Sequence, residues 1–203
     1  MTENTVFIYG GEELAHISLR DPKLGSHIER IGMIRREITP DLFESLTSGI
    51  ISQQVSAKAA ATVYVRLSEL AGEVTPNSIN KLDIEAIQSC GMSMRKASYI
   101  LSAASAALDG RLPLDKIPDM ADEEVINVLD ALPGIGRWTA EMLLIFSLRR
   151  PDILSYDDLG IRRGLMKLHG LDSIKPKEFE IYRSLYSPYG SVASFYLWHI
   201  AGE

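Results

Sequence analysis

The chain has 203 residues, of which 46% are hydrophobic, and a formal net charge of −6 at pH 7. This length and composition predict a globular protein that can bury a core of its own, as one domain or as two small lobes. The acidic balance argues against a general nucleic-acid coat protein, because phosphate groups are contacted by Lys and Arg.

Individual residue types exclude further classes. The longest apolar run, Met142 to Phe146, is too short to span a membrane, and the N-terminus lacks the basic and apolar regions of a signal peptide. We therefore expect a cytoplasmic protein. Cys90 is the only cysteine, which excludes an internal disulfide, a four-cysteine zinc site and a cysteine-ligated iron–sulfur cluster, so any metal must be held by oxygen.

The first fifty residues give a weak pattern followed by a strong one. Residues 6–9 have the composition of a short strand or of an apolar segment that packs against the core, and residues 24–34 have that of a modest helix. Thr39-Pro40 indicates the start of a second helix, whose apolar residues recur at helical spacing up to Ile51.

Further helices are expected as far as residue 131. The polar segment 52–56 ends the first apolar stripe, and Ser56 is typical of the N-cap of a helix over residues 57–71. Ser93 can cap an alanine-rich helix that runs to Leu108, and Asp122 can cap another that ends at Ala131.

Residues 132–136, Leu-Pro-Gly-Ile-Gly, fall between two helical patterns. Glycines at 134 and 136 let the backbone turn so tightly that its N–H groups point outward, directly before a helix that starts at Arg137. Unpaired N–H donors, the positive end of the helix dipole and the missing side chains together predict a phosphate site. On its own, such a segment is also compatible with an ordinary turn between helices.

The last third of the chain begins with an acidic pair. Residues 152–156 are predicted to be extended. Asp157-Asp158 stand at the start of a helix over residues 158–168, where an Asp often serves only as a cap. Helices over 176–186 and 191–201 follow. No stretch alternates with period two for long enough to form a sheet, so we expect an all-α fold of about ten helices.

Residues 132–142, LPGIGRWTAEM, followed by an Asp about twenty residues later, resemble the helix-hairpin-helix superfamily of DNA glycosylases. Trp138 makes the chain most similar to the 3-methyladenine DNA glycosylase II branch, which removes alkylated bases. Residues 50–60 are similar to the segment that carries the DNA wedge, residues 91–97 to the second minor-groove loop, and residues 187–198 to the last helix.

The resemblance implies a two-lobed helical fold with the active-site cleft between the lobes. Residues 1–203 would form a single glycosylase unit, with a central helical lobe of residues 40–131. Residues 1–39 and 132–203 would form the second lobe, which carries the hairpin at 132–136.

The resemblance also implies which residues contact DNA and ions. The implied DNA contacts are Gln54 as the wedge, Ser56, Ser93, Arg95, Arg137 and the backbone N–H groups of Gly134, Gly136 and Thr139. The family binds a monovalent cation, Na⁺ or K⁺, through hairpin carbonyls that match Asp130, Leu132 and Ile135. No other cofactor is expected.

A single carboxylate would be sufficient for the implied chemistry. Breaking the bond between a base and its sugar develops positive charge on the sugar, which a fixed carboxylate stabilises. Asp158 matches the catalytic acid, and Asp157, left as a cap or hydrogen-bond partner, remains a rival. An alkylated base such as a 3- or 7-methyl purine is already cationic and leaves as a neutral molecule, so no general acid is needed.

Trp138 separates the subfamilies. In bifunctional relatives this position is a lysine that forms a Schiff base with the sugar, which an indole cannot do. An indole face also attracts a cationic base. Trp198 and Tyr156 are expected to complete the substrate pocket, although Trp198 is equally compatible with a position in the core.

These expectations define one function and its alternatives. The preferred function is that of a monomeric, monofunctional DNA glycosylase that excises bases such as 3-methyladenine and 7-methylguanine from double-stranded DNA, leaving an abasic site for base excision repair. The alternatives are a bifunctional glycosylase-lyase for other damaged bases, a non-catalytic helix-hairpin-helix DNA-binding module and a helical interaction protein.

Overall fold

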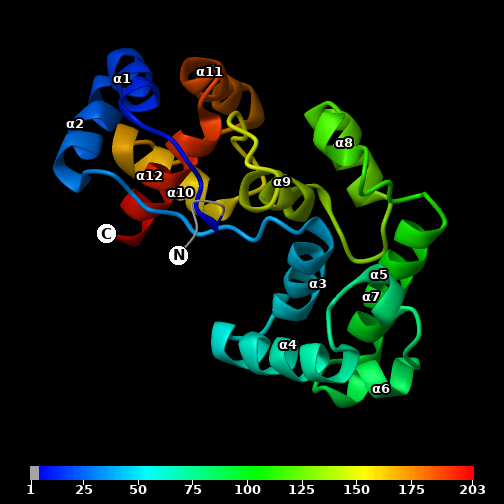
Figure 1. Cartoon of the computed structure of the whole chain (residues 1–203). Coiled ribbons are helices and arrows are strands. Elements are labelled where there is room, and N and C mark those ends of the chain that lie inside the picture. Colours follow the sequence, from blue (N-terminus) through cyan, green and yellow to red (C-terminus); the bar gives the residue numbers. More distant parts are fainter. Residues whose placement is uncertain (1–4) are drawn as a thin grey trace. The chain divides into compact units, whose positions relative to one another are not determined.

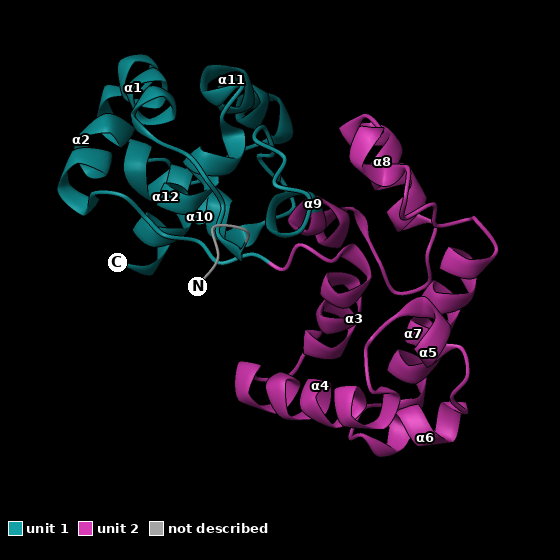
Figure 2. Ribbon diagram, viewed as in Figure 1, with its two compact units in different colours: residues 1–38, 144–203 teal, residues 39–143 magenta. Residues whose placement is uncertain are grey.

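The computed structural model describes residues 5–203, which form two compact units. The first unit combines the N-terminal segment up to Ile38 with Leu144–Glu203, and the second contains Thr39–Leu143 (Figure 2). In the described residues the regular structure consists of the α-helices α1 to α12 and the short 3-10 helix η2, so the expected all-α fold is confirmed (Figure 1).

The first unit is built around its last helix. It contains α1 (Gly11–Arg20), α2 (Pro22–Ile31), α10 (Leu159–His169), α11 (Pro176–Tyr186) and α12 (Gly190–Gly202). Helix α12 contacts the other four, and its residues 190–197 are all buried, as expected for a helix that is apolar on every side. A Cβ at Gly164 of α10 would lie 2.2 Å from Leu197 O, so a glycine is needed where α10 crosses α12.

The second unit contains the remaining helices. They are α3 (Leu42–Ser52), α4 (Ala57–Ala71), α5 (Pro76–Ile79), α6 (Ile84–Ser89), α7 (Met94–Leu108), η2 (Ile117–Asp119) and α8 (Asp122–Asp130). Helix α9 (Arg137–Phe146) begins in this unit and ends in the first. Ser56 and Ser93 cap α4 and α7 as predicted, by accepting bonds from Ala59 N and Lys96 N.

The N-terminal forty residues differ from the prediction. Two helices, α1 and α2, replace the single helix expected at 24–34. Helix α1 covers residues for which no helix was expected, and α2 starts at Pro22 because Asp21 caps it. Residues 6–9 form no strand, and Val6 makes only an isolated bridge to Glu37. Helix α3 begins after Asp41, whose carboxylate accepts a bond from Glu44 N, and not at Thr39-Pro40.

The boundary between the units also differs from the expected lobes. The hairpin at 132–136 was expected to belong with the C-terminal residues, whereas it groups with residues 39–131. The reason is local packing: Gln53 Nε2 donates to Gly134 O at 2.8 Å, and the ring of Tyr99 lies directly over Gly134.

Over the residues that the structure describes, no helix is both long and apolar enough to cross a membrane.

Candidate active site and DNA-contact residues

The glycine turn forms as the sequence predicts. Gly134 has a φ of +83°, Ile135 N donates to Leu132 O at 3.1 Å, and Ala140 N donates to Gly136 O at 3.0 Å as α9 begins. Both glycines are exposed. The turn therefore presents backbone without side chains at the positive end of a helix, which is the arrangement that binds phosphate.

Three segments that are distant in sequence meet around one hollow in the second unit. The hollow has a volume of about 450 Å³. Its lining residues are Ile51, Gln53, Gln54 and Val55, Ala59 and Val63 of α4, Gly91, Met92, Ser93, Arg95, Lys96 and Tyr99, and Gly134. The segments around Gln54 and Ser93 and the hairpin are the three regions expected to contact DNA. The structure thus brings together in one unit elements that the sequence could only list separately.

The individual DNA-contact candidates on these loops are accessible. Gln54, Ser56, Ser93 and Arg95 are all exposed, and Gln54 and Arg95 line the hollow. Gln54 has a φ of +57°, a left-handed backbone that non-glycine residues seldom adopt. Thr139, in the first turn of α9, is half-buried.

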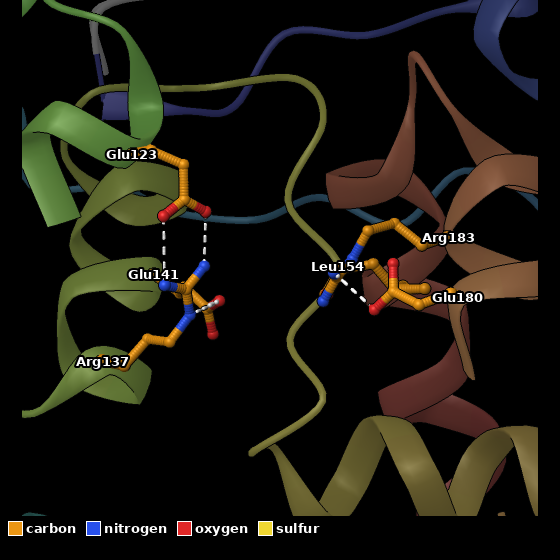
Figure 3. Close-up of polar contacts among 6 residues, drawn as sticks. All are labelled: Glu123, Arg137, Glu141, Leu154, Glu180 and Arg183. Atoms are coloured by element: carbon orange, nitrogen blue, oxygen red, sulfur yellow. Dashed lines mark hydrogen bonds and ion pairs between the residues drawn. The ribbon is translucent and has the colours of Figure 1, made fainter. Parts of the chain in front are cut away.

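Arg137 is engaged differently from the expectation. Its guanidinium forms a two-bonded ion pair with Glu123 of α8, and its Nε lies 3.2 Å from Glu141 Oε1, one turn along α9 (Figure 3). Hydrogen bonding to Glu123 is the main cause that raises the pKa of Arg137. Arg137 therefore fastens α8 to the start of α9, and a phosphate would have to compete with two carboxylates for it.

Asp158 occupies the start of α10. The residue is 7% exposed, and its Oδ1 accepts hydrogen bonds from Ile161 N at 2.8 Å and from Trp198 Nε1 at 2.9 Å. A Cβ at Gly160 would lie 2.7 Å from Trp198 Cδ1 and 3.1 Å from Asp158 Oδ1. The carboxyl group is therefore held in one orientation by a helix terminus and an indole that only a glycine at 160 accommodates.

Trp198 has a role that neither sequence interpretation described. The sequence predicts a pocket wall or a core residue, whereas the indole N–H is a hydrogen-bond donor to the acid. The ring is stacked against Phe146 and Phe195, with centroids 5.8 and 6.2 Å away, and the Arg36 guanidinium lies 5.9 Å from its centroid. Because aromatic neighbours fix the indole, its N–H is a rigid donor.

The structure distinguishes the two adjacent acids. Asp158 is the buried cap of α10, while Asp157 is exposed and does not occupy the cap position that was assigned to it. Tyr156, expected in the substrate pocket, packs edge-to-face on Phe179 with the Arg162 guanidinium 5.0 Å from its ring centroid. These contacts give Tyr156 a packing role in the first unit.

Trp138 lies in the first turn of α9 and is 45% exposed. That exposure is incompatible with a core position. The residue that follows Arg137 is therefore a partly exposed indole, and it has no amine with which to form a Schiff base.

Comparisons with known proteins agree with this geometry. Residues 47–188 match the family model described as the HhH-GPD superfamily base excision DNA repair protein. The chain belongs to this family. DNA-3-methyladenine glycosylase 1 of Schizosaccharomyces pombe is 38% identical over 161 residues, which cover 77% of this chain and 71% of that protein.

Solved structures give the same result. A DNA-3-methyladenine glycosidase from Bacillus halodurans aligns with a TM-score of 0.87 and 36% identity, over 97% of this chain and 92% of that one. The Schizosaccharomyces pombe 3-methyladenine DNA glycosylase Mag1, in complex with abasic DNA, aligns with a TM-score of 0.79 and 34% identity, over 93% and 95%. These relatives support the assignment of the chain to the 3-methyladenine glycosylase branch of the family.

Sequence reasoning missed the residues that brace the segment before Asp158 in this HhH-GPD protein. Ser191 Oγ accepts a bond from Ile153 N, and Ser194 Oγ donates to Ile153 O. The Arg183 guanidinium donates to Leu154 O at 2.9 and 3.2 Å (Figure 3). The two serines stand three apart on α12, a spacing that places them on one helix face. Only this spacing could have indicated their role in advance.

Proposed function

We propose that this protein is a monofunctional DNA glycosylase that hydrolyses the N-glycosidic bond of cationic alkylated bases, such as 3-methyladenine and 7-methylguanine, in duplex DNA. The observation that carries the proposal is the buried, doubly hydrogen-bonded carboxyl group of Asp158. In a member of the HhH-GPD family, such an acid can stabilise the positive charge that develops on the sugar when the base leaves. The product would be an abasic site, the starting point of base excision repair.

The reaction requires that the damaged nucleotide be rotated out of the DNA duplex. A base stacked in a duplex cannot be reached at its sugar bond, so the enzyme extrudes the nucleotide at a cost of a few kcal/mol that is smallest for a damaged base. The exposed Gln54 can fill the gap that the base leaves, since a flat amide both stacks and hydrogen-bonds. The turn at Gly134 and Gly136 and the N-termini of α4 and α7 supply phosphate-binding donors from the same unit.

The chemical step requires one acid. Water oxygen forms a bond to the anomeric carbon as the bond from that carbon to the base nitrogen breaks, and the bonding electron pair leaves with the base and neutralises its positive charge. The Asp158 carboxylate stabilises the positive charge on the sugar and accepts the proton that the water releases. Trp198 and the N-terminus of α10 keep that carboxylate in place while the charge develops.

Substrate preference would come from Trp138. A cation over an indole face gains about 0.5 to 2 kcal/mol, which favours a cationic methylated base over the neutral parent base. Without a lysine at this position, the sugar is attacked by water alone and the DNA backbone stays intact. We also propose that the enzyme acts as a monomer on DNA in the cytoplasm.

A monovalent cation at the hairpin is part of the proposal. The carbonyl groups of Asp130, Leu132 and Ile135 are neutral hard donors, and among the described residues no group of three or more His, Cys, Asp or Glu side chains could hold a divalent metal. Leu132 O accepts one hydrogen bond from Ile135 N and keeps a second lone pair for an ion. Bound there, Na⁺ or K⁺ would supply positive charge beside a DNA phosphate.

Base release from methylated duplex DNA tests the function. Wild type should release methylated purines, and Asp158→Asn should lose about 100- to 1,000-fold in single-turnover rate while its amide oxygen still accepts both hydrogen bonds. Equal release by the two proteins would remove Asp158 from its role. Trapping of a covalent protein–DNA adduct with borohydride would show that the enzyme is bifunctional.

A further inference from the structure

Lys96 lies in the first turn of α7. A basic residue at a DNA-binding surface would be expected to contact phosphate, but the Lys96 ammonium group binds backbone carbonyls. Its Nζ donates to Ile51 O at 2.8 Å and to Gln53 O at 2.6 Å. These carbonyls lie at the C-terminal end of α3, where backbone oxygens lack partners within the helix and where a positive charge is favoured. Lys96 therefore caps a helix other than its own.

The residue that follows this capped end is Gln54. Its left-handed backbone is one that a glutamine rarely adopts, so contacts from outside the local sequence must hold it. The carbonyl of Gln53, which Lys96 holds, belongs to the peptide bond that links Gln53 to Gln54. The lysine thus acts on the peptide plane from which the wedge side chain departs.

The same helix also contacts the hairpin. Tyr99, one turn beyond Lys96, lies over Gly134, and Gln53 Nε2 donates to Gly134 O. The wedge segment, α7 and the glycine turn are consequently joined by a closed set of contacts around the hollow in the second unit. A substitution of Lys96 should therefore first disturb the backbone conformation of the wedge segment.

We propose that Lys96 is a positioning residue for base extrusion: it fixes the backbone at Gln53 and Gln54 so that the Gln54 side chain is held ready to enter the DNA stack. Lys96 does not touch the reacting atoms. This inference rests on the proposed function, because it assigns Lys96 to the extrusion step of the same reaction. A preorganised wedge avoids ordering the loop at the moment of insertion, which is a cost that otherwise slows the step.

The test compares substrates that do and do not require extrusion. Lys96→Met removes the donors and keeps the length of the side chain, Lys96→Arg keeps the donors, and Lys81→Met changes an exposed lysine elsewhere in the unit. Lys96→Met should slow single-turnover release from a paired duplex by about 10- to 100-fold, because small misplacements cost this much. Release from the same methylated base in a single strand should remain near the wild-type rate.

Two further readouts accompany the rates. Lys96→Arg should recover most of the paired-duplex rate, and Lys81→Met should match wild type on both substrates. A 2-aminopurine base placed beside a stable abasic analogue should become less fluorescent with Lys96→Met than with wild type, which reports incomplete unstacking independently of base release.

Several outcomes would overturn the inference. They are an equal loss on paired and single-stranded substrates, an unchanged rate on the paired duplex, or no recovery with Lys96→Arg. Failure of the wild-type protein to release any methylated base is a different result, because it would overturn the proposed function itself.

Discussion

At the scale of single residues, the proposed chemistry depends most on the hydrogen bond from the Trp198 indole N–H to the Asp158 carboxylate. Trp198 could not be assigned from the sequence, because its pattern fits a core position and a pocket equally well. In the structure the Trp198 ring packs on Phe146 and Phe195, and this stacking fixes the direction in which its N–H donates a hydrogen bond.

Trp198→Phe isolates this donor. The substitution keeps an aromatic ring in the stack and removes the indole N–H that donates to Asp158. DNA affinity should stay near wild type while single-turnover base release falls about tenfold, the cost of one lost hydrogen bond to a charged group. Rapid-quench measurement on methylated duplex DNA, together with a binding isotherm, would check both values. A rate equal to wild type would mean that the N-terminus of α10 alone orients the acid.

Gly160→Ala tests whether the close packing of Gly160 against Trp198 is needed to hold the same acid. The new methyl would lie 2.7 Å from Trp198 Cδ1, so the indole must shift. Because this shift displaces the donor to Asp158, the single-turnover rate should fall by about 10- to 100-fold. Gly49→Ala is the matched control, because a Cβ there meets nothing within 4 Å and the residue lies inside a helix, where alanine is favoured. Equal rates for the two variants would contradict the fit described for Gly160.

At the scale of elements, the helix caps were only partly predictable, because Asp21 and Asp41 cap α2 and α3 where the sequence did not indicate it. Ser56 and Ser93 start α4 and α7 as expected because a serine before an apolar periodic run carries a local signal. Long-range partners carry no such signal. The pairing of Arg137 with Glu123, the cap that Lys96 provides to α3 and the bond from Arg183 to Leu154 all join residues whose sequence neighbours do not indicate them.

The pairing between α8 and α9 leads to a prediction about DNA affinity. Glu123→Gln removes one of the two negative charges beside Arg137 and leaves phosphate to compete with Glu141, so affinity for undamaged duplex DNA should rise. The dependence of log affinity on log salt should steepen by about one unit if Arg137 then contacts a phosphate. Binding measured by fluorescence anisotropy across a salt series would check it, with Glu85→Gln on α6 as a control for the change in net charge. Identical slopes for the two variants would show that Arg137 stays a purely structural link.

At the scale of the whole molecule, the resemblance in sequence predicted the fold class and the family, and both are confirmed. The units divide at residues 38 and 143, and not beside residue 131, because tertiary contacts to the hairpin outweigh its proximity in sequence to the C-terminal helices. Contacts of this kind depend on packing between distant segments, which periodicity and capping do not encode.

A buried polar cluster ties three helices of the first unit together and should make its stability depend on pH. Tyr186 Oη donates to Asp21 Oδ2 at 2.6 Å, and His169 Nε2 lies 3.1 Å from the same oxygen. Burial is the main cause that lowers the pKa of His169, with Asp21 acting in the opposite direction and Lys23 in the same one. The folded protein therefore binds a proton at His169 less readily than the unfolded chain does.

The sign of the effect follows from this difference. Above the ordinary histidine pKa of about 6.5, neither state carries the proton and the stability is fully present. As the pH falls below that value and through the lower pKa of the folded state, the unfolded chain gains protons first and the free energy of unfolding decreases. Urea midpoints between pH 7.5 and pH 5 should fall for wild type and for His27→Gln, which changes a half-buried histidine outside this cluster, and should fall less for His169→Gln. A decline of the same size in His169→Gln would assign the pH dependence to other groups.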